Sequence, residues 1–148
     1  MKMRALVMAG VMALTAVAST RVAQAQEPIV VNIPFDFVAG GKTLPAGEYS
    51  VKVSAGPVQT LLLIDRQDAS SSAFMGTNAI IASEPKANSK LVFNRYGDRY
   101  FLSQVWTAGN SRGRLLLKSD REKEIAQTAK FETQGQVTLV AGLPHNTR

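Results

Sequence analysis

The sequence predicts a mainly β protein, a small antiparallel β-sandwich or barrel with one short C-terminal helix. Short runs rich in β-branched and aromatic residues recur along the chain, with turn residues between them at intervals of about eight to twelve residues. The pattern changes to that of a helix only once, after residue 119. Because the chain contains no cysteine, packing without disulfides has to hold the fold together.

Residues 1–25 have the composition of a cleaved signal peptide. Lys2 and Arg4 give a basic start, and residues 5–18 form an apolar run of 14 residues without a charge. A stable membrane-spanning helix needs about 20 residues, so this run predicts export rather than a permanent anchor. The Ala-Gln-Ala sequence at residues 23–25 predicts cleavage directly after it.

Residues 26–148 are expected to be the mature protein, a single β-rich domain with a loose tail at residues 143–148. The whole chain carries a formal charge of +6, and the predicted signal peptide accounts for three of these charges, which leaves +3. This mild basicity falls far short of a nucleic-acid-binding surface, so we expect no nucleic-acid partner. No second long apolar run follows, so we expect no transmembrane segment and a periplasmic or extracellular location.

The first strand of the mature part is predicted at residues 29–38. Pro34 lies within it and lacks the N–H that a central strand donates, so this strand is expected at a sheet edge or with a bulge. Residues 44–47 then place proline and glycine where a type I turn favours them.

Three further strands are predicted before residue 83. Residues 48–54 alternate, with three apolar side chains on one face. Residues 60–65 form a compact apolar run that predicts a strand buried on both faces. After a turn at residues 66–68, a strand is predicted within residues 72–82, and residues 83–89 are expected to form a loop.

A β-hairpin is predicted around Gly97-Asp98. Residues 90–96 and 99–107 flank this two-residue connection, which is typical of a tight hairpin turn. Pairing across the turn places Arg95 opposite Tyr100.

The hairpin is also the densest aromatic region of the chain, and both of its faces mix apolar and polar side chains. Two interpretations remain open. The aromatic residues form a core face and stiffen the hairpin through cross-strand pairs, or they form an exposed surface with arginines, as at protein–protein contacts. On the second interpretation the candidate binding residues are Arg95, Tyr96, Arg99 and Tyr100.

The C-terminal third predicts a loop, a helix and a last strand. Residues 108–114 are expected to form a flexible basic loop. Ser119 and Glu122 have the spacing of a capping box, which predicts a short helix over residues 120–130. Residues 136–141 predict the final strand.

Few residues of this chain are suited to catalysis or to metal binding. His145, the one histidine, lies near the C-terminus, where a side chain is rarely held in place for catalysis. Without a second histidine or a cysteine, the chain has no Ser-His-acid triad and no two-His or thiolate metal site. We therefore expect no metal, no cofactor and no catalytic residues.

Asp36 is the one carboxylate with an unusual setting, because it lies between Phe35 and Phe37. It is expected to have a structural role, either facing solvent on an edge strand or paired with Arg95 or Arg99. A glycan hydrolase needs two carboxylates, and the sequence does not indicate which second carboxylate would act with Asp36.

Three segments resemble a family of small secreted acidobacterial proteins of unassigned function. They are VNIPFDF at residues 31–37, KTLPAGEY at residues 42–49 and KLVFNRYGDRYFL at residues 90–102. The charged start of the predicted helix, at residues 119–126, resembles the C-terminal part of these proteins. The resemblance covers nearly all of the predicted mature part and implies secretion, but it implies no activity.

We predict a non-enzymatic exported protein, a binding or structural module of the cell envelope or extracellular matrix. Its partner would be an envelope or extracellular protein or polysaccharide, held by the hairpin surface. The first alternative is a carrier of a small molecule, a lipid or pigment, in a β-barrel or sandwich cavity. The second is a carboxylate-dependent glycan hydrolase that uses Asp36.

Overall fold

The computed structural model describes residues 27–54, 58–129 and 134–142, where it has ten strands and one helix. All ladders are antiparallel except one short parallel pairing, which confirms the predicted mainly β class with a short C-terminal helix. The predicted signal peptide and the tail lie outside the described residues. Along the chain the elements are β1 (Ile29–Ile33), β2 (Phe37–Ala39), β3 (Lys42–Leu44), β4 (Gly47–Val53), β5 (Thr60–Asp65), β6 (Ser72–Ile81), β7 (Lys90–Tyr96), β8 (Arg99–Trp106), β9 (Arg112–Leu116), α1 (Asp120–Thr128) and β10 (Gln134–Val140).

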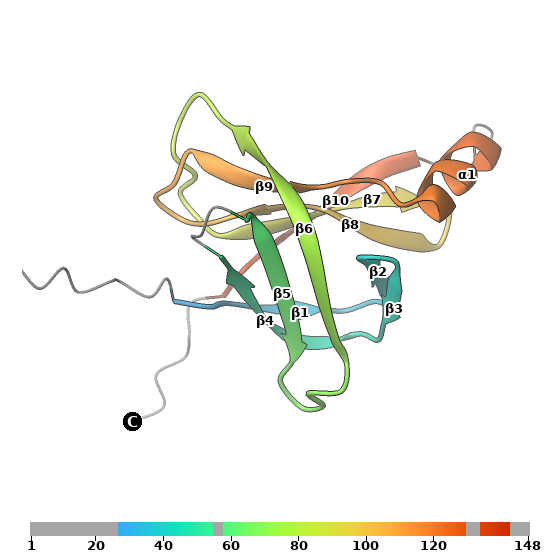
Figure 1. The fold of residues 1–148 in the computed structure, drawn as a ribbon, viewed down its shortest axis with the longest axis horizontal. Coiled ribbons are helices and arrows are strands. Elements are labelled where there is room, and N and C mark those ends of the chain that lie inside the picture. The colour runs from blue at the N-terminus through green and yellow to red at the C-terminus, as the bar shows by residue number, and fades with distance from the viewer. Residues whose placement is uncertain (1–26, 55–57, 130–133, 143–148) are drawn as a thin grey trace, which may run out of the picture.

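The strands form two layers that share β6 (Figure 1). Residues 72–76 of β6 pair with β5, in the layer that also contains β4 and β1. Residues 77–81 of the same strand pair with β9, in the layer that continues through β8 and β7 to β10. Figure 1 shows β6 crossing from one layer to the other.

The two ends of this strand path lie beside each other. β1 and β10 are in contact, but no ladder between described residues joins them, so the sheet is open there. The short β2–β3 hairpin lies across one end of the layers, where Val38 pairs in parallel with Phe101 of β8. This arrangement turns the apolar faces of both layers inward.

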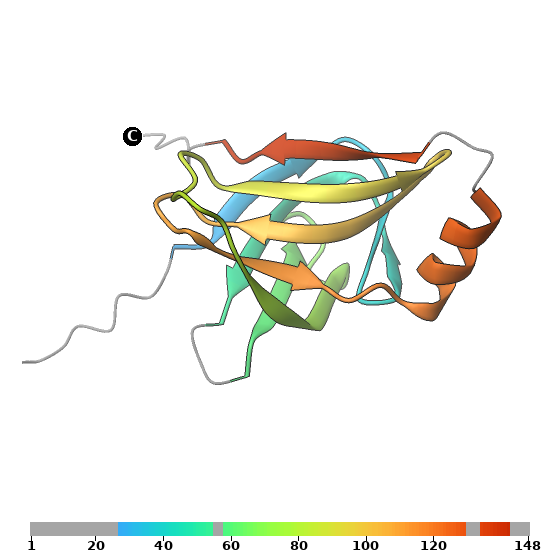
Figure 2. The same ribbon diagram turned by 90° about the horizontal axis from the view of Figure 1, so that it is seen from above.

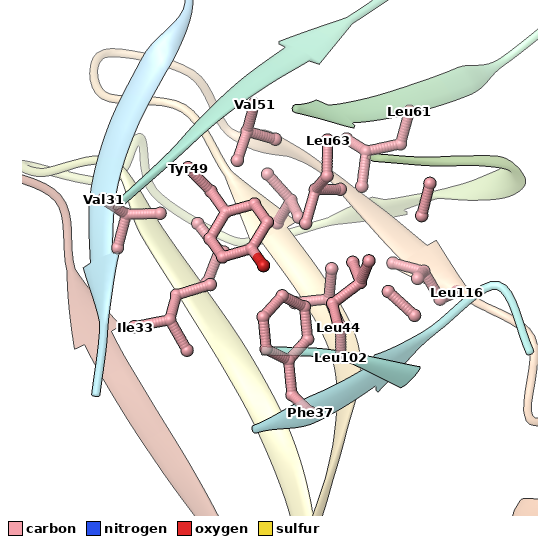
Figure 3. Packing of buried hydrophobic residues seen from close by; sticks show 14 of the residues in the cluster. Val31, Ile33, Phe37, Leu44, Tyr49, Val51, Leu61, Leu63, Leu102 and Leu116 are labelled. Atoms are coloured by element: carbon pink, nitrogen blue, oxygen red, sulfur yellow. The ribbon is translucent and has the colours of Figure 1, made fainter. Parts of the chain in front are cut away.

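Large side chains fill the space between the layers (Figure 3). The ring of Phe37, from the β2–β3 hairpin, meets the rings of Tyr49 and Phe93 edge to face at centroid distances of 5.2 and 5.5 Å. Such contacts contribute beyond the area that they bury. The largest side chains with less than 2% of their surface exposed are those of Val31, Ile33, Phe37, Leu44, Tyr49, Val51, Leu61, Leu63, Leu91, Phe93 and Val105.

Tyr49 contributes a polar group to this core. Its hydroxyl donates a hydrogen bond of 2.7 Å to the carbonyl oxygen of Pro45. Burial raises the pKa of Tyr49 to about 12, with smaller contributions from the carboxylates of Asp65, Asp36 and Asp68. The protonated hydroxyl therefore ties the start of β4 to the connection that precedes it.

The single strand predicted at residues 29–38 is interrupted in the structure. β1 ends at Ile33, Pro34 is exposed in the break, and β2 begins at Phe37. Because proline fixes its own φ and cannot donate to a ladder, the chain leaves the sheet here and enters the β2–β3 hairpin. The predicted edge position is confirmed, since β1 pairs only with β4 among the described ladders.

Two other expectations are wrong. In β5, Leu61 and Leu63 are buried but Leu62 and Ile64 are only half-buried, because no layer of described residues covers the outer face of this sheet. The loop predicted at residues 108–114 ends early, since β9 begins at Arg112.

Trp106 explains why β9 contains a glycine. It pairs with Gly113, and a Cβ placed on that glycine would lie 2.6 Å from Cε3 of the indole ring. The indole Nε1 donates to Oε1 of Gln104 at 2.9 Å, and Lys86 Nζ lies 5.1 Å from the ring centroid. With these neighbours Trp106 is only 7% exposed, although it lies outside the main core cluster.

We expect Gly113→Ala to lower the free energy of unfolding by about 1–3 kcal/mol, the range for an overpacked site. The added methyl group would force the Trp106 ring out of position. Gly135→Ala is the matched control, because a Cβ there meets no atom of a described residue within 4 Å. Urea unfolding of both variants checks this, and equal midpoints would contradict it.

The raised pKa of Tyr49 predicts a loss of stability at alkaline pH. Below pH 10 the hydroxyl is protonated in both states, and between about pH 10 and 12 only the unfolded chain releases its proton. The free energy of unfolding should therefore fall more steeply over this range in the wild type than in Tyr49→Phe. Denaturant titrations at several alkaline pH values measure the two slopes, and identical slopes would refute the assignment.

Candidate functional site

The turn of the β7–β8 hairpin, the β2–β3 hairpin and α1 meet at one end of the molecule (Figure 2). Gly97 has a φ of 58°, which a tight hairpin turn requires and which glycine adopts without strain. The predicted hairpin is confirmed, with Arg95 opposite Tyr100. A register shift between Val92 and Phe93, which was not predicted, displaces the pairing farther from the turn.

Arg95, Tyr100 and Phe35 form a stack on the inner side of the hairpin. The rings of Tyr100 and Phe35 are nearly parallel, with centroids 3.9 Å apart. The guanidinium carbon of Arg95 lies 5.7 Å from the Tyr100 centroid, and Arg95 Nε donates to the carbonyl oxygen of Gly97 at 2.8 Å. Arg95 and Tyr100 are therefore held in place and half-buried.

The helix α1 covers the opposite side of the hairpin, and its predicted start is confirmed. The hydroxyl oxygen of Ser119 accepts a hydrogen bond from the backbone N–H of Glu122 at 3.2 Å, as an N-cap should. Ile125, Ala126 and Ala129 pack against the residues beneath, which include Tyr96 and Phe101. The rings of that pair meet edge to face at 5.8 Å.

Glu122 uses its side chain to bind the sheet rather than to complete the capping box. Its Oε1 accepts hydrogen bonds from Asn94 Nδ2 at 3.0 Å and from the Tyr96 hydroxyl at 3.2 Å. Gln136 of β10 extends the cluster, since its Nε2 donates to Asn94 Oδ1 at 3.3 Å. Glu122 is only 5% exposed, so this polar cluster lies beneath the helix.

A cleft of about 210 Å³ separates α1 from the hairpin turn and β2. It contains two arginines from different elements, Arg99 of β8 and Arg121 of α1. Neither guanidinium group forms an ion pair or a hydrogen bond with a described residue. The ion pairs among the described residues, Arg66–Glu48 and Lys123–Asp120, lie outside the cleft. The lining residues are Asp36, Phe37, Val38, Thr43, Asp98, Arg99, Tyr100, Phe101, Arg121 and Ile125.

The four candidate binding residues occupy different environments. Arg99 is exposed and Tyr100 is half-buried, and both line the cleft. Arg95 does not line it and lies against Tyr100 instead. Tyr96 is only 6% exposed beneath α1, although it lines a neighbouring hollow together with Arg99. The hairpin therefore presents Arg99 and Tyr100 to the cleft, while Tyr96 mainly holds the helix.

Asp36 is exposed, and its Oδ1 accepts a hydrogen bond from the backbone N–H of Ala46 at 2.9 Å. It lines the cleft together with Asp98, which makes two carboxylates there. No group of three or more His, Cys, Asp or Glu side chains among the described residues could hold a metal ion. His145 lies outside those residues.

The sequence did not identify Arg121 or the partners of Glu122. Glu122 was recognised only as a helix-start residue, and its contacts with Asn94 and Tyr96 join positions 28 and 26 residues apart. Arg121 stands beside it in the same charged segment, where a helix start is the expected interpretation of the local pattern. Only the docking of α1 on the hairpin brings Arg121 to the cleft.

Comparisons with known proteins give no family: no family model, curated protein or solved structure matches the chain. In the part of the chain that the structure describes, no helix is long and apolar enough to span a membrane.

The polar cluster predicts different effects for two tyrosines of one hairpin. Tyr96→Phe should lower the free energy of unfolding by about 1–2 kcal/mol, because it removes a donor to a buried carboxylate. Tyr100→Phe is the control, since its hydroxyl makes no hydrogen bond with a described residue. Urea unfolding measures both, and amide exchange in α1 should accelerate only in Tyr96→Phe. Equal effects of the two substitutions would contradict this role of Tyr96.

Proposed function

We propose that this chain is an exported, non-enzymatic binding module that holds an acidic group of an envelope or extracellular partner, a protein or a polysaccharide. The observation that carries the proposal is the position of Arg99 and Arg121 in one cleft, without an ion pair to any described residue. A guanidinium group is a planar donor that recognises carboxylate and phosphate groups through two parallel hydrogen bonds. Two such groups in one cleft suit an acidic ligand.

The other lining residues narrow the chemistry of the ligand. Asp36 and Asp98 add acceptors, so the cleft suits an acidic group that stands beside hydroxyl or amide donors. Phe35 covers one face of the Tyr100 ring, and Arg95 lies near the same ring. Tyr100 is thus better suited to hydrogen bonding through its hydroxyl than to stacking on a sugar.

The predicted signal peptide supports a partner outside the cytoplasm. The alternatives of a carrier and of a hydrolase have less support. Large side chains fill the space between the layers, where a carrier would hold its ligand. Asp36, the carboxylate considered for hydrolysis, already accepts a backbone hydrogen bond through one of its two oxygens.

Replacing both cleft arginines should abolish partner capture. We expect immobilised wild-type protein to retain a partner from an envelope extract, and Arg99→Ser/Arg121→Ser to retain at least about tenfold less, as loss of a charge-assisted contact implies. Arg112→Ser is the matched control, because Arg112 is an exposed arginine outside the cleft. Circular dichroism of each variant confirms that the fold is intact.

Capture should also weaken as salt concentration rises, because screening reduces contacts between exposed charges. The proposal fails if the wild type retains no partner, or if Arg112→Ser reduces capture as much as the double substitution does.

A further inference from the structure

A second hollow, of about 200 Å³, adjoins the first turn of α1 and has no part in the proposed function. The β2–β3 turn, the middle of β6 and the segment between β9 and α1 surround it. Its walls are part apolar and part polar: Met75, Leu102 and Leu116 line it, and so do the polar side chains of Ser119 and Glu122. It therefore combines apolar surface with the carboxylate of Glu122.

Glu122 is only 5% exposed, and its carboxylate has no counterion among the described residues. It forms no ion pair with a described residue, and its Oε2 accepts no hydrogen bond from one. The two donors to Oε1, from Asn94 and Tyr96, are neutral. Lys118 is nearby, but its Nζ lies over the ring of Tyr96, 5.9 Å from the centroid.

The hydrogen bonds to Oε1 compensate the charge of Glu122 only in part. Removing a carboxylate from water is costly, and neutral donors and the helix dipole compensate only in part because they supply partial charges. A group that brings a full positive charge to Glu122 would complete the compensation. The group should also be able to place apolar surface against Met75, Leu102 and Leu116.

We propose that this hollow binds a small organic ammonium ion, a primary amine on a short apolar chain. The ammonium nitrogen donates to Glu122 and to the Ser119 hydroxyl, and the chain lies against the apolar wall. A metal ion would need several oxygen ligands, whereas Glu122 is the only carboxylate among the described residues that line the hollow. The site adjoins the arginine cleft, with which it shares Val38 and Phe101, and has the opposite charge preference.

The test is an NMR titration of the isotope-labelled protein with n-butylammonium chloride at constant ionic strength. We expect saturable shifts at amides around the hollow, Gly40, Gly41, Ser119 and Glu122, with a dissociation constant on the order of millimolar for so small a ligand. n-Butanol, which has the same chain without the charge, should bind the wild type at least about tenfold more weakly.

Substitution of Glu122 provides the second arm of the test. Glu122→Gln keeps the size and an acceptor for Asn94 and Tyr96 but removes the charge, and should weaken n-butylammonium binding at least about tenfold. Glu124→Gln is the matched control, because Glu124 is an exposed residue of the same helix and does not line the hollow.

Three results would overturn the proposal. They are equal binding of n-butanol and n-butylammonium, unchanged binding by Glu122→Gln, and shifts that do not saturate below about 50 mM. The comparison of n-butylammonium with n-butanol uses the wild type alone, so it tests the proposal even if Glu122→Gln does not fold. None of these results bears on the arginine cleft, whose test uses different variants and a different ligand.

Discussion

The arrangement of both layers depends on β6 remaining one strand while its partner changes from β5 to β9. Alternate residues along it, Ala73, Met75 and Thr77, are buried, and they span the point where the partner changes. A continuous strand shared in this way holds two twisted sheets face to face, so that each buries the apolar face of the other. Since the chain has no cysteine, this apolar contact holds the layers together without disulfides.

The helix depends on tertiary contacts to a greater degree than the strands do. Nine residues are too few for a stable helix in water, so its N-cap and its contacts with the hairpin must maintain it. Ile125, Ala126 and Ala129 supply a narrow apolar face, and Glu122 accepts hydrogen bonds from two residues of β7. We infer that the polar cluster mainly fixes the orientation of the helix. A buried charge contributes little net stability, but it requires hydrogen-bond donors at defined positions.

The features that the sequence predicted correctly are set by neighbouring residues. The hairpin around Gly97-Asp98 and the helix that starts after Ser119 both follow from short local patterns. The strand β9 was missed because its glycine fits only once Trp106 lies against it, which is a contact between strands. The exposure of Leu62 was missed for a similar reason, since a run of apolar residues does not indicate whether a second layer covers them.

The same limit applies to the candidate site. Arg99 and Tyr100 could be identified from the sequence as candidates, but the sequence left open which aromatic residues of the hairpin are covered. The answer depends on α1, which begins more than 20 residues after Tyr96 and buries it, while Arg99 remains exposed. The packing of α1 on the hairpin also places Arg121 in the cleft. A local pattern could therefore predict the helix but not the site that the helix completes.

Docking of α1 also connects the two proposed binding sites. Val38 and Phe101 line both the arginine cleft and the hollow beside Glu122, and the first turn of α1 supplies a charged residue to each, Arg121 to the first and Glu122 to the second. A ligand that binds either site only when the helix is docked stabilises the docked state by mass action.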